Sequence, residues 1–475
     1  MMEWIQIFTL AVHTLRNEDN MKKNEAFTMT VEDIGVGGEG IGKADGYTLF
    51  VKDTIPGDII KGIVTKAGPK YGYGRLTEII EPSKDRIEAR CPVARSCGGC
   101  QIQEMAYEKQ LSLKKRTVKN SLDRIGGLSD YVLFDTIGCE SPFRYRNKAQ
   151  FPVGRNRDGK IIAGFFAGRT HHIIECRDCQ IGIEENQTIL DVIIHHMEHF
   201  GIEPYNEKTH TGLVRYLLIR KGFHTGEIML CLVINGDSIK EQELLVSTLR
   251  ERIPALCDIS LNINKKKINT IMGKHFVQLY GNGYISDFIG GIQFRISPKS
   301  FYQVNPKQTE ILYGKALEYA ALTGKETVFD LYCGVGTISL FLAKSAAKVY
   351  GVEVVPEAIA DAKVNAALNG IDNVEFLTGK AEDIIPSLYA EEGVSADVVV
   401  LDPPRKGCDE KVLETIARMR PKRIVYVSCN PATLARDLKY LAGEGFHVEL
   451  VQPLDMFANT VHVESVVLLS KLKLM

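Results

Sequence analysis

A cysteine in the last third of the chain stands where a nucleophile could act. Cys429 follows the apolar β run RIVYVS (residues 423–428) and precedes a turn and a helical pattern that begins at Pro431. A buried cysteine is usually only a small apolar residue, but the carboxyl end of a parallel strand faces the edge where ligands bind. A thiolate at this edge could add to carbon 6 of a uracil ring and make carbon 5 nucleophilic toward a sulfonium methyl group.

A carboxylate near the end of the chain could act as the base that this chemistry requires. After methylation, carbon 5 of the ring still carries its proton, which must leave before the thiolate can be eliminated. Glu464 stands at the start of the last apolar run, VESVVLLSK (463–471), and is the candidate for this role. The alternative interpretation of Glu464 is a surface carboxylate in contact with water.

A loop with two glycines between a strand and a helix indicates a cofactor site. The segment DLYCGVGT (330–337) lets the backbone approach a ligand, and Glu353 ends the next apolar run, where a carboxylate can accept hydrogen bonds from ribose hydroxyls. Ser339 stands where the dinucleotide fingerprint has a third glycine. This departure and the leading Asp330 favour S-adenosylmethionine over a nicotinamide dinucleotide. A tight turn without a ligand is the remaining alternative.

A second carboxylate stands at the end of another apolar run. Asp402 closes the run DVVVLD (397–402) and is followed by two prolines. The prolines make the loop rigid, so that a charge is held at the carboxyl edge of the sheet, beside the cofactor cleft. A simple turn is the alternative interpretation.

These candidates follow strands of one predicted sheet. From residue 286 onward, apolar runs alternate with helical patterns such as PEAIADAKVNAALN and PATLARDLKYLAGE. This alternation is typical of a doubly wound, mainly parallel sheet. We therefore expect a Rossmann-like α/β domain over residues 286–475, whose carboxyl edge carries Asp402 and Cys429.

Two further domains precede this one. Residues 22–80 contain short β-rich runs separated by glycine-containing turns, which predicts a small β-barrel. Residues 81–285 mix strands and helices and predict a central α+β domain, with a helix over residues 103–124. We interpret residues 1–21 as a tail or an over-long start, because Met21 is a second plausible start.

The composition is that of a globular protein without a membrane anchor. The 475 residues are 45% hydrophobic and 25% charged, and the formal net charge is −1 at pH 7. Any polyanion must therefore bind a local patch rather than a general basic surface. No run of about 18 uncharged apolar residues is present, and residues 5–12 lack the flanks of a signal peptide. The eleven cysteines do not form a disulfide framework of the secreted type, so we expect a cytoplasmic protein.

Two local patches combine cations with aromatic residues. Residues 61–75 of the predicted barrel carry four cations, two tyrosines and no acids, so that bases could stack on the rings while the cations hold phosphates. The alternative for this patch is a solvated hairpin. A denser patch is FRYRNK (143–148), followed by Arg155, Arg157 and Lys160. The denser patch favours unstacked, single-stranded RNA as the partner.

Five segments resemble motifs of the bacterial RNA uracil-5-methyltransferase family, in the order in which the family has them. They are SFYQVNP (300–306), DLYCGVGTISL (330–340), LDPPRKG (401–407), VYVSCNPATLARDL (425–438) and HVESVVLL (462–469). The resemblance extends over residues 24–475. It includes the N-terminal barrel, which resembles the TRAM domain, an OB-like RNA-binding module.

The resemblance implies a set of functional residues. It implies that S-adenosylmethionine is bound by four residues, namely Gln303, Tyr332, Glu353 and Asp402. It also implies Cys429 as the nucleophile and Glu464 as the proton acceptor. Thr337 departs from some relatives, which carry asparagine there. The resemblance further implies that the helix near residues 103–124 packs on the methyltransferase domain, and we expect a monomer.

Three closely spaced cysteines indicate a metal site. Cys91, Cys97 and Cys100 have the spacing C-x5-C-x2-C, for which a zinc site, an iron–sulfur cluster and unrelated thiols are the alternatives. Zinc ligands usually come as two close couples, whereas a distant fourth thiolate is common in iron–sulfur clusters and would here be Cys176 or Cys179. The resemblance implies a 4Fe–4S cluster with Cys179 as the fourth ligand. Because the spacing is not that of radical enzymes, we expect a structural or RNA-shaping role.

The residues alone leave the RNA target open. The cluster-bearing branch of the family mostly acts on large-subunit ribosomal RNA, so the resemblance favours 23S ribosomal RNA, and transfer RNA is the alternative. A non-catalytic RNA-binding scaffold would not need Cys429 and Glu464 at the cofactor edge. A dehydrogenase would have no use for a barrel, and the barrel favours RNA over the DNA substrate of a cytosine methyltransferase.

Overall fold

The computed structural model describes residues 21–268 and 270–471. The predicted tail lies outside the described residues except for Met21, which packs in the core of the barrel described below. Among the helices that the structure describes, none is long and apolar enough to cross a membrane.

The chain divides into two compact units, which are described separately. The first unit consists of the chain up to Leu113 together with the short segment Asn459–Val461. The second unit consists of Lys114–Ala458 and the chain from His462 onward.

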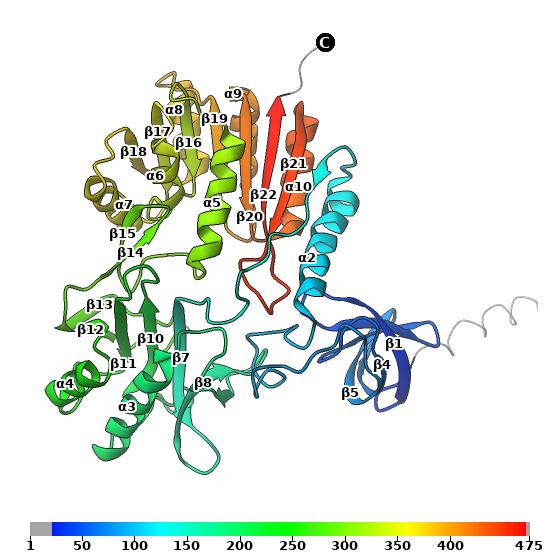
Figure 1. The fold of residues 1–475 in the computed structure, drawn as a ribbon, viewed down its shortest axis with the longest axis vertical. Helices are drawn as coiled ribbons and strands as arrows, with labels where there is room; N and C mark the ends of the chain where they lie inside the picture. Colours follow the sequence, from blue (N-terminus) through cyan, green and yellow to red (C-terminus); the bar gives the residue numbers. More distant parts are fainter. Residues whose placement is uncertain (1–20, 269, 472–475) are drawn as a thin grey trace, which may run out of the picture. The chain divides into compact units, whose positions relative to one another are not determined.

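The first unit contains a closed β-barrel, drawn in blue in Figure 1. Its strand order is β1-β2-β3-β5-β4, and the pairing of β1 with β4 closes it. Closure leaves no free strand edge, and alternate residues of the strands fill the interior. The strands are β1 (Ala26–Ile34), β2 (Gly40–Ala44), β3 (Tyr47–Val51), β4 (Ile59–Ala67) and β5 (Tyr71–Glu81). The predicted N-terminal barrel is confirmed.

A helix follows the barrel and the loop that carries three of the cysteines. The predicted helix over residues 103–124 is observed as α2 (Tyr107–Ser121), which continues into a short π-helix, η1 (Leu122–Gly126). Val118 and Leu122 are buried in an apolar cluster of the eight-stranded sheet described below. This part of the helix therefore packs on that sheet, as the resemblance implies.

The second unit begins with a seven-stranded sheet of mixed direction. Its strand order is β13-β12-β11-β10-β7-β8-β9, and β11 and β12 are parallel whereas the other pairs are antiparallel. The strands are β7 (Lys148–Arg155), β8 (Ile161–Phe166), β9 (Ile173–Glu175), β10 (Val214–Lys221), β11 (Ile228–Ile234), β12 (Leu256–Ile263) and β13 (His275–Tyr280). Two helices, α3 (Glu185–His199) and α4 (Gln242–Arg252), pack apolar residues against this sheet. The predicted central α+β region is thus observed.

The second unit also contains an eight-stranded sheet in the order β18-β17-β16-β19-β20-β22-β21-β6. The first five strands of this order are parallel, while β22 runs antiparallel to both of its neighbours. The strands are β6 (Val132–Leu133), β16 (Thr327–Leu331), β17 (Lys348–Glu353), β18 (Val374–Thr378), β19 (Val398–Leu401), β20 (Arg423–Ser428), β21 (Phe446–Leu454) and β22 (Glu464–Lys471). The predicted Rossmann-like α/β fold is confirmed. One difference is that β6, from the stretch assigned to the central domain, joins this sheet.

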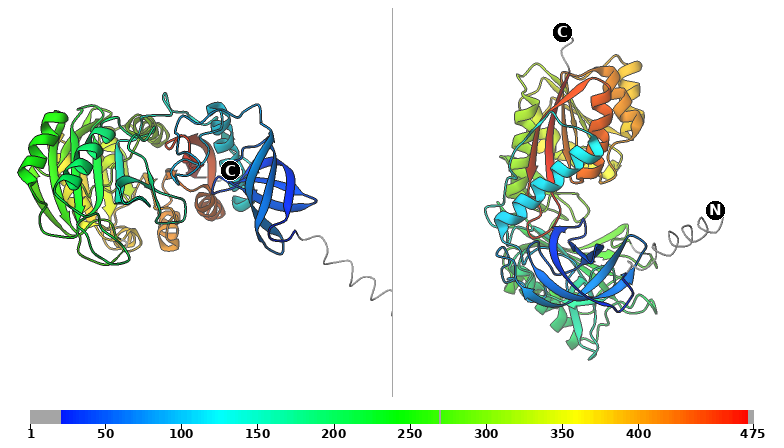
Figure 2. Two further views of the ribbon diagram at one scale, coloured as in Figure 1. Left: turned by 90° about the horizontal axis from the view of Figure 1, so that it is seen from below. Right: turned by 90° about the vertical axis from the view of Figure 1, so that its right-hand side faces the viewer.

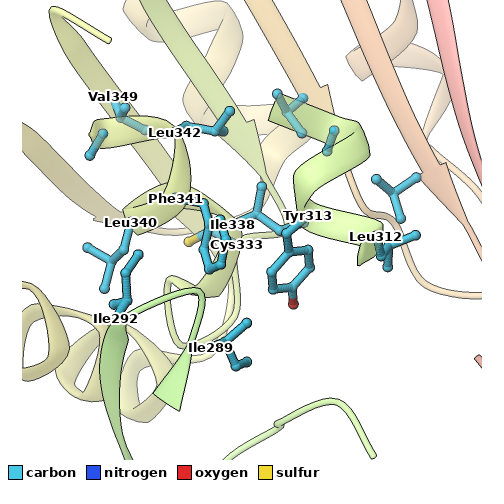
Figure 3. Packing of buried hydrophobic residues seen from close by; sticks show 14 of the residues in the cluster. Ile289, Ile292, Leu312, Tyr313, Cys333, Ile338, Leu340, Phe341, Leu342 and Val349 are labelled. Atoms are coloured by element: carbon cyan, nitrogen blue, oxygen red, sulfur yellow. The ribbon is translucent and has the colours of Figure 1, made fainter. Parts of the chain in front are cut away.

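Helices cover both faces of the eight-stranded sheet, as expected for buried parallel strands (Figure 2). One face carries α5 (Pro306–Ala320), α6 (Thr337–Ala343), α7 (Pro356–Leu368) and the hairpin of β14 (Ile285–Ile289) and β15 (Ile292–Ile296). The other face carries α8 (Ala381–Ala390), α9 (Glu410–Met419) and α10 (Pro431–Gly443). Figure 3 shows how Ile338 and Phe341 of α6 lie beside Tyr313 of α5 within the first layer.

A buried ion pair holds the loop that leads from β21 to β22. Lys114 of α2 and Asp455 are both fully buried, and their Nζ and Oδ1 atoms are 2.5 Å apart. Lys114 also donates a hydrogen bond to the carbonyl of Phe457 at 3.1 Å. Because a buried charge is costly without its partner, this pair ties the loop firmly to α2.

We predict that Lys114→Ala lowers the free energy of unfolding by about 3 kcal/mol or more, because the Asp455 carboxylate then loses its ammonium partner inside the protein. Urea titration followed by circular dichroism measures this loss. The double variant Lys114→Met, Asp455→Leu removes both charges and is expected to lose less. An equal loss in the single and double variants would contradict this account.

Candidate active site

Three of the predicted site residues lie at one edge of the eight-stranded sheet. Asp402 follows the last residue of β19, and Cys429 follows the last residue of the neighbouring parallel strand β20. Strand β22 runs in the opposite direction and begins at Glu464, and Ser465 pairs with Ser428. The antiparallel direction of β22 therefore brings Glu464 to the edge where β19 and β20 end.

Burial and mutual repulsion change the acidity of all three groups. Burial, followed by the nearby Glu464 and Asp402 carboxylates, raises the pKa of the Cys429 thiol to about 11. Burial raises the pKa of Asp402 to about 7. Glu464 is 4% exposed, and burial followed by repulsion from Asp402 raises its pKa well above the ordinary range. The site therefore holds a protonated thiol beside Asp402, which can take or give a proton near neutral pH, and beside Glu464, which keeps its proton to a higher pH than an ordinary carboxyl group.

Arg405 is a site residue that the sequence analysis did not single out. Its positive charge acts on both Cys429 and Glu464 and lowers the pKa of each, against the larger effect of burial. The Arg405 carbonyl accepts hydrogen bonds from Asn430 Nδ2 at 3.0 Å and Thr433 Oγ1 at 3.1 Å. These bonds fix the loop after Asp402 to the first turn of α10, so that the cation stays close to the thiol.

The predicted cofactor loop adopts the turn that its glycines allow. Gly336 has a φ of 78°, a conformation that favours glycine, and it caps α6. Glu353, at the end of β17, accepts hydrogen bonds from the amides of Gly334 at 3.2 Å and Val355 at 2.9 Å. The loop and the carboxylate expected to contact a ribose are thus held together.

Ser339 has a specific partner in this loop. Its hydroxyl donates a hydrogen bond of 2.5 Å to Asp330 Oδ2. The other carboxyl oxygen of Asp330 is buried without a hydrogen-bond partner among the described residues, and burial raises the pKa of Asp330 to about 7. The serine that replaces the third glycine of the dinucleotide fingerprint therefore binds the leading aspartate.

The other predicted cofactor residues have different surroundings. Tyr332 has a φ of 69° and packs partly against an apolar cluster, where burial and the neighbouring Cys408 raise the pKa of its hydroxyl. The backbone carbonyl of Gln303 accepts a hydrogen bond of 2.9 Å from Nδ2 of the buried Asn147. Thr337 bonds to the hydroxyl of Tyr313 at 2.9 Å. Asn147 and Tyr313 are thus supporting residues that carried no signal in the sequence.

A cavity of about 620 Å³ opens beside this loop. Its lining includes Gly334 and Glu353 from the eight-stranded sheet and Phe276 and Gln278 from the central sheet. Gln303, Tyr332 and Asp402 do not line it. Of the four predicted cofactor residues, only Glu353 therefore borders this space.

Comparison with known proteins decides the family. A family model described as tRNA (uracil-5-)-methyltransferase matches residues 106–472, and a TRAM domain model matches residues 22–77. The chain belongs to the tRNA (uracil-5-)-methyltransferase family. The predicted family and the TRAM-like nature of the barrel are confirmed.

Relatives extend over nearly the whole chain. An uncharacterized RNA methyltransferase of Halalkalibacterium halodurans is 50% identical over 449 residues, which cover 94% of this chain and 98% of the relative. One from Bacillus cereus is 49% identical over 453 residues, covering 95% and 98%. The crystal structure of Pyrococcus abyssi tRNA (uracil-54, C5)-methyltransferase in complex with S-adenosyl-L-homocysteine aligns with a TM-score of 0.74 and 26% identity, covering 93% of this chain and 99% of that one.

The cysteine loop of this methyltransferase family member lies in the first unit. Cys91, Cys97 and Cys100 are partly exposed, and the Gly99 amide donates a hydrogen bond to Cys97 Sγ at 3.3 Å. Cys179, also partly exposed, belongs to the second unit. Within residues 21–268 and 270–471, no group of three or more His, Cys, Asp or Glu side chains is arranged to hold a metal ion. Cysteine sulfurs with an amide donor suit a metal–thiolate site chemically, and the predicted ligand set draws on both units.

Both predicted RNA patches have part of their charge paired within the protein, and on the barrel Lys61 pairs with Glu78 at 3.0 Å. On the TRAM barrel, the rings of Tyr71 and Tyr73 lie 6.1 Å apart, and Tyr71 is half exposed. In the FRYRNK patch, Arg144 pairs with Asp178 at 2.7 Å. Part of the predicted positive charge is therefore neutralised within the protein, whereas the exposed tyrosine remains available for stacking.

We predict that alkylation of Cys429 by iodoacetamide is slow at pH 7.5 and accelerates about tenfold per pH unit toward pH 10, because only the thiolate reacts and its pKa is about 11. Glu464→Gln removes one of the carboxylates that raise this pKa, so the variant should react faster at pH 9. Mass spectrometry of the Cys429 peptide measures the rate. The exposed Glu444→Gln is the matched control and should leave the rate unchanged; full reaction of the wild-type thiol at pH 7.5 would contradict this account.

Proposed function

We propose that this protein transfers a methyl group from S-adenosylmethionine to carbon 5 of a uridine in RNA, through a covalent bond between Cys429 and carbon 6 of the ring. The observation that carries the proposal is the meeting of Cys429, Asp402 and Glu464 at one sheet edge. Membership of the methyltransferase family and the S-adenosyl-L-homocysteine bound to the Pyrococcus abyssi enzyme support the methyl donor. The TRAM barrel supports RNA as the partner.

The first step is attack by Cys429. With a pKa of about 11 the thiol is protonated at neutral pH, so a base must take its proton as the sulfur bonds to carbon 6. Asp402 has a pKa of about 7 and lies close enough to raise the pKa of the thiol, which suits it to accept this proton. Arg405 would stabilise the negative charge that develops.

The second part of the reaction transfers the methyl group and releases the product. S-adenosylmethionine supplies the methyl group on a sulfonium, which leaves as a neutral thioether. The electron pair from the sulfur attack makes carbon 5 the nucleophile, and the new carbon–carbon bond leaves one extra proton on carbon 5. Glu464 takes that proton, the carbon 5–carbon 6 double bond re-forms, and the bond to Cys429 Sγ breaks.

We assign the methyl donor to Gln303, Tyr332, Glu353 and Asp402. Glu353 already accepts two backbone amides, which fixes its carboxylate beside the glycine turn at Gly334. A carboxylate in that position can also accept hydrogen bonds from ribose hydroxyls. The cavity beside Glu353 provides space for a ligand.

We propose 23S ribosomal RNA as the substrate, on the resemblance to the cluster-bearing branch of the family. Transfer RNA is the second candidate, because the Pyrococcus abyssi relative is a tRNA methyltransferase. We further propose that the protein acts in the cytoplasm, where its RNA substrate is found, and that it acts as a monomer.

We predict that Glu464→Gln traps a covalent protein–RNA adduct that carries the transferred methyl group, because an amide cannot accept the carbon 5 proton. The adduct is measured as a labelled band that resists denaturation, formed with an unmodified 23S ribosomal RNA transcript and absent with unmodified transfer RNA. The control Cys429→Ala should form no adduct and no product while still binding S-adenosylmethionine.

Three other results would change the proposal. Ordinary turnover by Glu464→Gln would show that this carboxylate is not the base. Turnover by Cys429→Ala would overturn the covalent mechanism. An adduct with transfer RNA alone would assign the transfer RNA substrate.

We also propose a 4Fe–4S cluster held by Cys91, Cys97, Cys100 and Cys179, with a structural or RNA-shaping role. The support is the spacing of the first three cysteines and the amide that donates to Cys97 Sγ. Four thiolates are the usual ligands of such a cluster.

We predict that protein purified without oxygen contains about four iron and four sulfide ions per chain. Elemental analysis and the visible absorption spectrum measure the content. Cys179→Ser should lower it strongly, whereas Cys176→Ser, its neighbour in the sequence, should leave it unchanged. A colourless protein with stoichiometric zinc would contradict the cluster.

A further inference from the structure

Three cations gather on one face of the central sheet. Lys148 is the first residue of β7 and pairs directly with Arg220 of β10 in the antiparallel register. Arg146 stands two residues before Lys148, and alternate residues of an extended chain point to the same side. Directly opposed like charges destabilise a sheet, so this arrangement calls for a compensating group.

No compensating carboxylate is supplied by the described part of the chain. Within residues 21–268 and 270–471, Arg146, Lys148 and Arg220 form no ion pair. Arg220 is only 3% exposed. The Nε atoms of Arg146 and Arg220 are buried and have no hydrogen-bond partner among these described residues. Burial, followed by repulsion from Arg220 and Arg146, lowers the pKa of Lys148 to about 8. Buried donors of this kind are normally satisfied.

Neighbouring cations of the same region are neutralised. Arg144 lies 2.7 Å from Asp178, and Arg155 lies 2.7 Å from Glu203. Lys221, the residue after Arg220, pairs with Glu185. The lack of carboxylates is therefore confined to one face rather than a general property of the sheet.

This face lies next to the proposed active site. The Arg220 guanidinium donates a hydrogen bond to the carbonyl of Ser300, at the start of the segment that carries Gln303. Asn147, between Arg146 and Lys148, holds the Gln303 carbonyl.

Arg146 is also close to the loop that leads to Glu464. His462 stands two residues before Glu464, and its pKa is lowered by burial and then by the positive charges of Arg405, Lys114 and Arg146. Arg220 therefore contacts the start of the Gln303 segment, and Arg146 is close enough to act electrostatically on the loop that leads to Glu464.

We propose that Arg146, Lys148 and Arg220 bind a phosphodiester group of the RNA strand beside the target uridine. A base that leaves its stack to reach Cys429 needs its backbone held in place, and guanidinium groups match the oxygens of a phosphate. The inference rests on the proposed function, because it identifies how the RNA strand is held at that same site. A carboxylate of the methyl donor is the other anion that this face could receive, and the experiment separates the two.

The test measures binding of an unmodified 23S ribosomal RNA transcript and of S-adenosyl-L-homocysteine by the full-length protein. Lys148→Met should weaken RNA binding roughly tenfold and reduce the slope of log K against log salt by about 0.7–0.9, the loss expected for one phosphate contact. Binding of S-adenosyl-L-homocysteine should not change. Lys148→Arg should keep most of the affinity, and Lys221→Gln, which removes a neutralised charge from the adjacent position, should leave it unchanged.

Thermal unfolding of the free protein gives a second readout. If Lys148 only supports the fold, Lys148→Met should lower Tm. If Lys148 is instead a phosphate ligand, its removal relieves repulsion from Arg146 and Arg220, and Tm should stay equal or rise. A lower Tm together with unchanged RNA affinity would overturn the phosphate site.

Three further outcomes would also decide against it. Loss of S-adenosyl-L-homocysteine binding with normal RNA binding would assign the face to the cofactor. If the wild-type protein methylates RNA and Lys148→Met binds RNA normally, the phosphate site is overturned but the proposed function is not. Failure of the wild-type protein to bind and methylate any RNA would overturn the proposed function and this site with it.

Discussion

Desolvation of two carboxyl groups beside a thiol is the constraint on which the candidate active site depends. Glu464 is buried and Asp402 partly buried at the sheet edge, each near enough to Cys429 to raise its pKa. In water these groups would be a pair of carboxylates and an ordinary thiol. Burial at this edge raises the pKa of both carboxyl groups, and the positive charge of Arg405 acts against this effect at Cys429 and Glu464. The reaction proposed for the site uses this poised state at both proton transfers.

The surrounding structure keeps this arrangement rigid through buried polar contacts. Lys114 and Asp455 hold the loop between β21 and β22, whose last turn leads to Glu464. Asn305 caps α5 through the amide of Gln308 and also donates to the carbonyl of Met456 at 3.2 Å. Lys114 and Asn305 each donate a hydrogen bond to a backbone carbonyl of this loop, at Phe457 and Met456 respectively. The site is therefore fixed by contacts between elements that lie far apart in the sequence.

Much of this architecture could be predicted because its signals are local. The alternation of apolar runs and helical patterns predicted the Rossmann-like sheet, and the residues after those runs, Asp402 and Cys429, indicated its functional edge. The antiparallel direction of β22 and the addition of β6 had no local signal, because a short apolar run predicts a strand but not its direction or its partner in the sheet. Arg405, Asn147 and Arg220 were missed for a related reason. Their importance comes from partners more than 20 residues away or from the absence of a partner, and the neighbouring residues in the sequence predict neither property.

The cysteine ligand set shows the limit of spacing as evidence. Cys91, Cys97 and Cys100 lie close together in the sequence, and this closeness predicts a shared ligand. The proposed fourth ligand, Cys179, belongs to the other compact unit, so no pattern within one segment could identify it. Only the family resemblance distinguishes Cys179 from Cys176.

The position of β22 in the sheet has a consequence for how the protein is made. This strand lies between β20 and β21, although it follows both of them in the chain. During synthesis the earlier strands therefore leave the ribosome with a gap between them that only the final described strand can fill. Such late, non-local closure slows folding and leaves two strand edges exposed until it occurs. The same strand carries Glu464, so a nascent chain completes the sheet and the proposed catalytic edge in a single event.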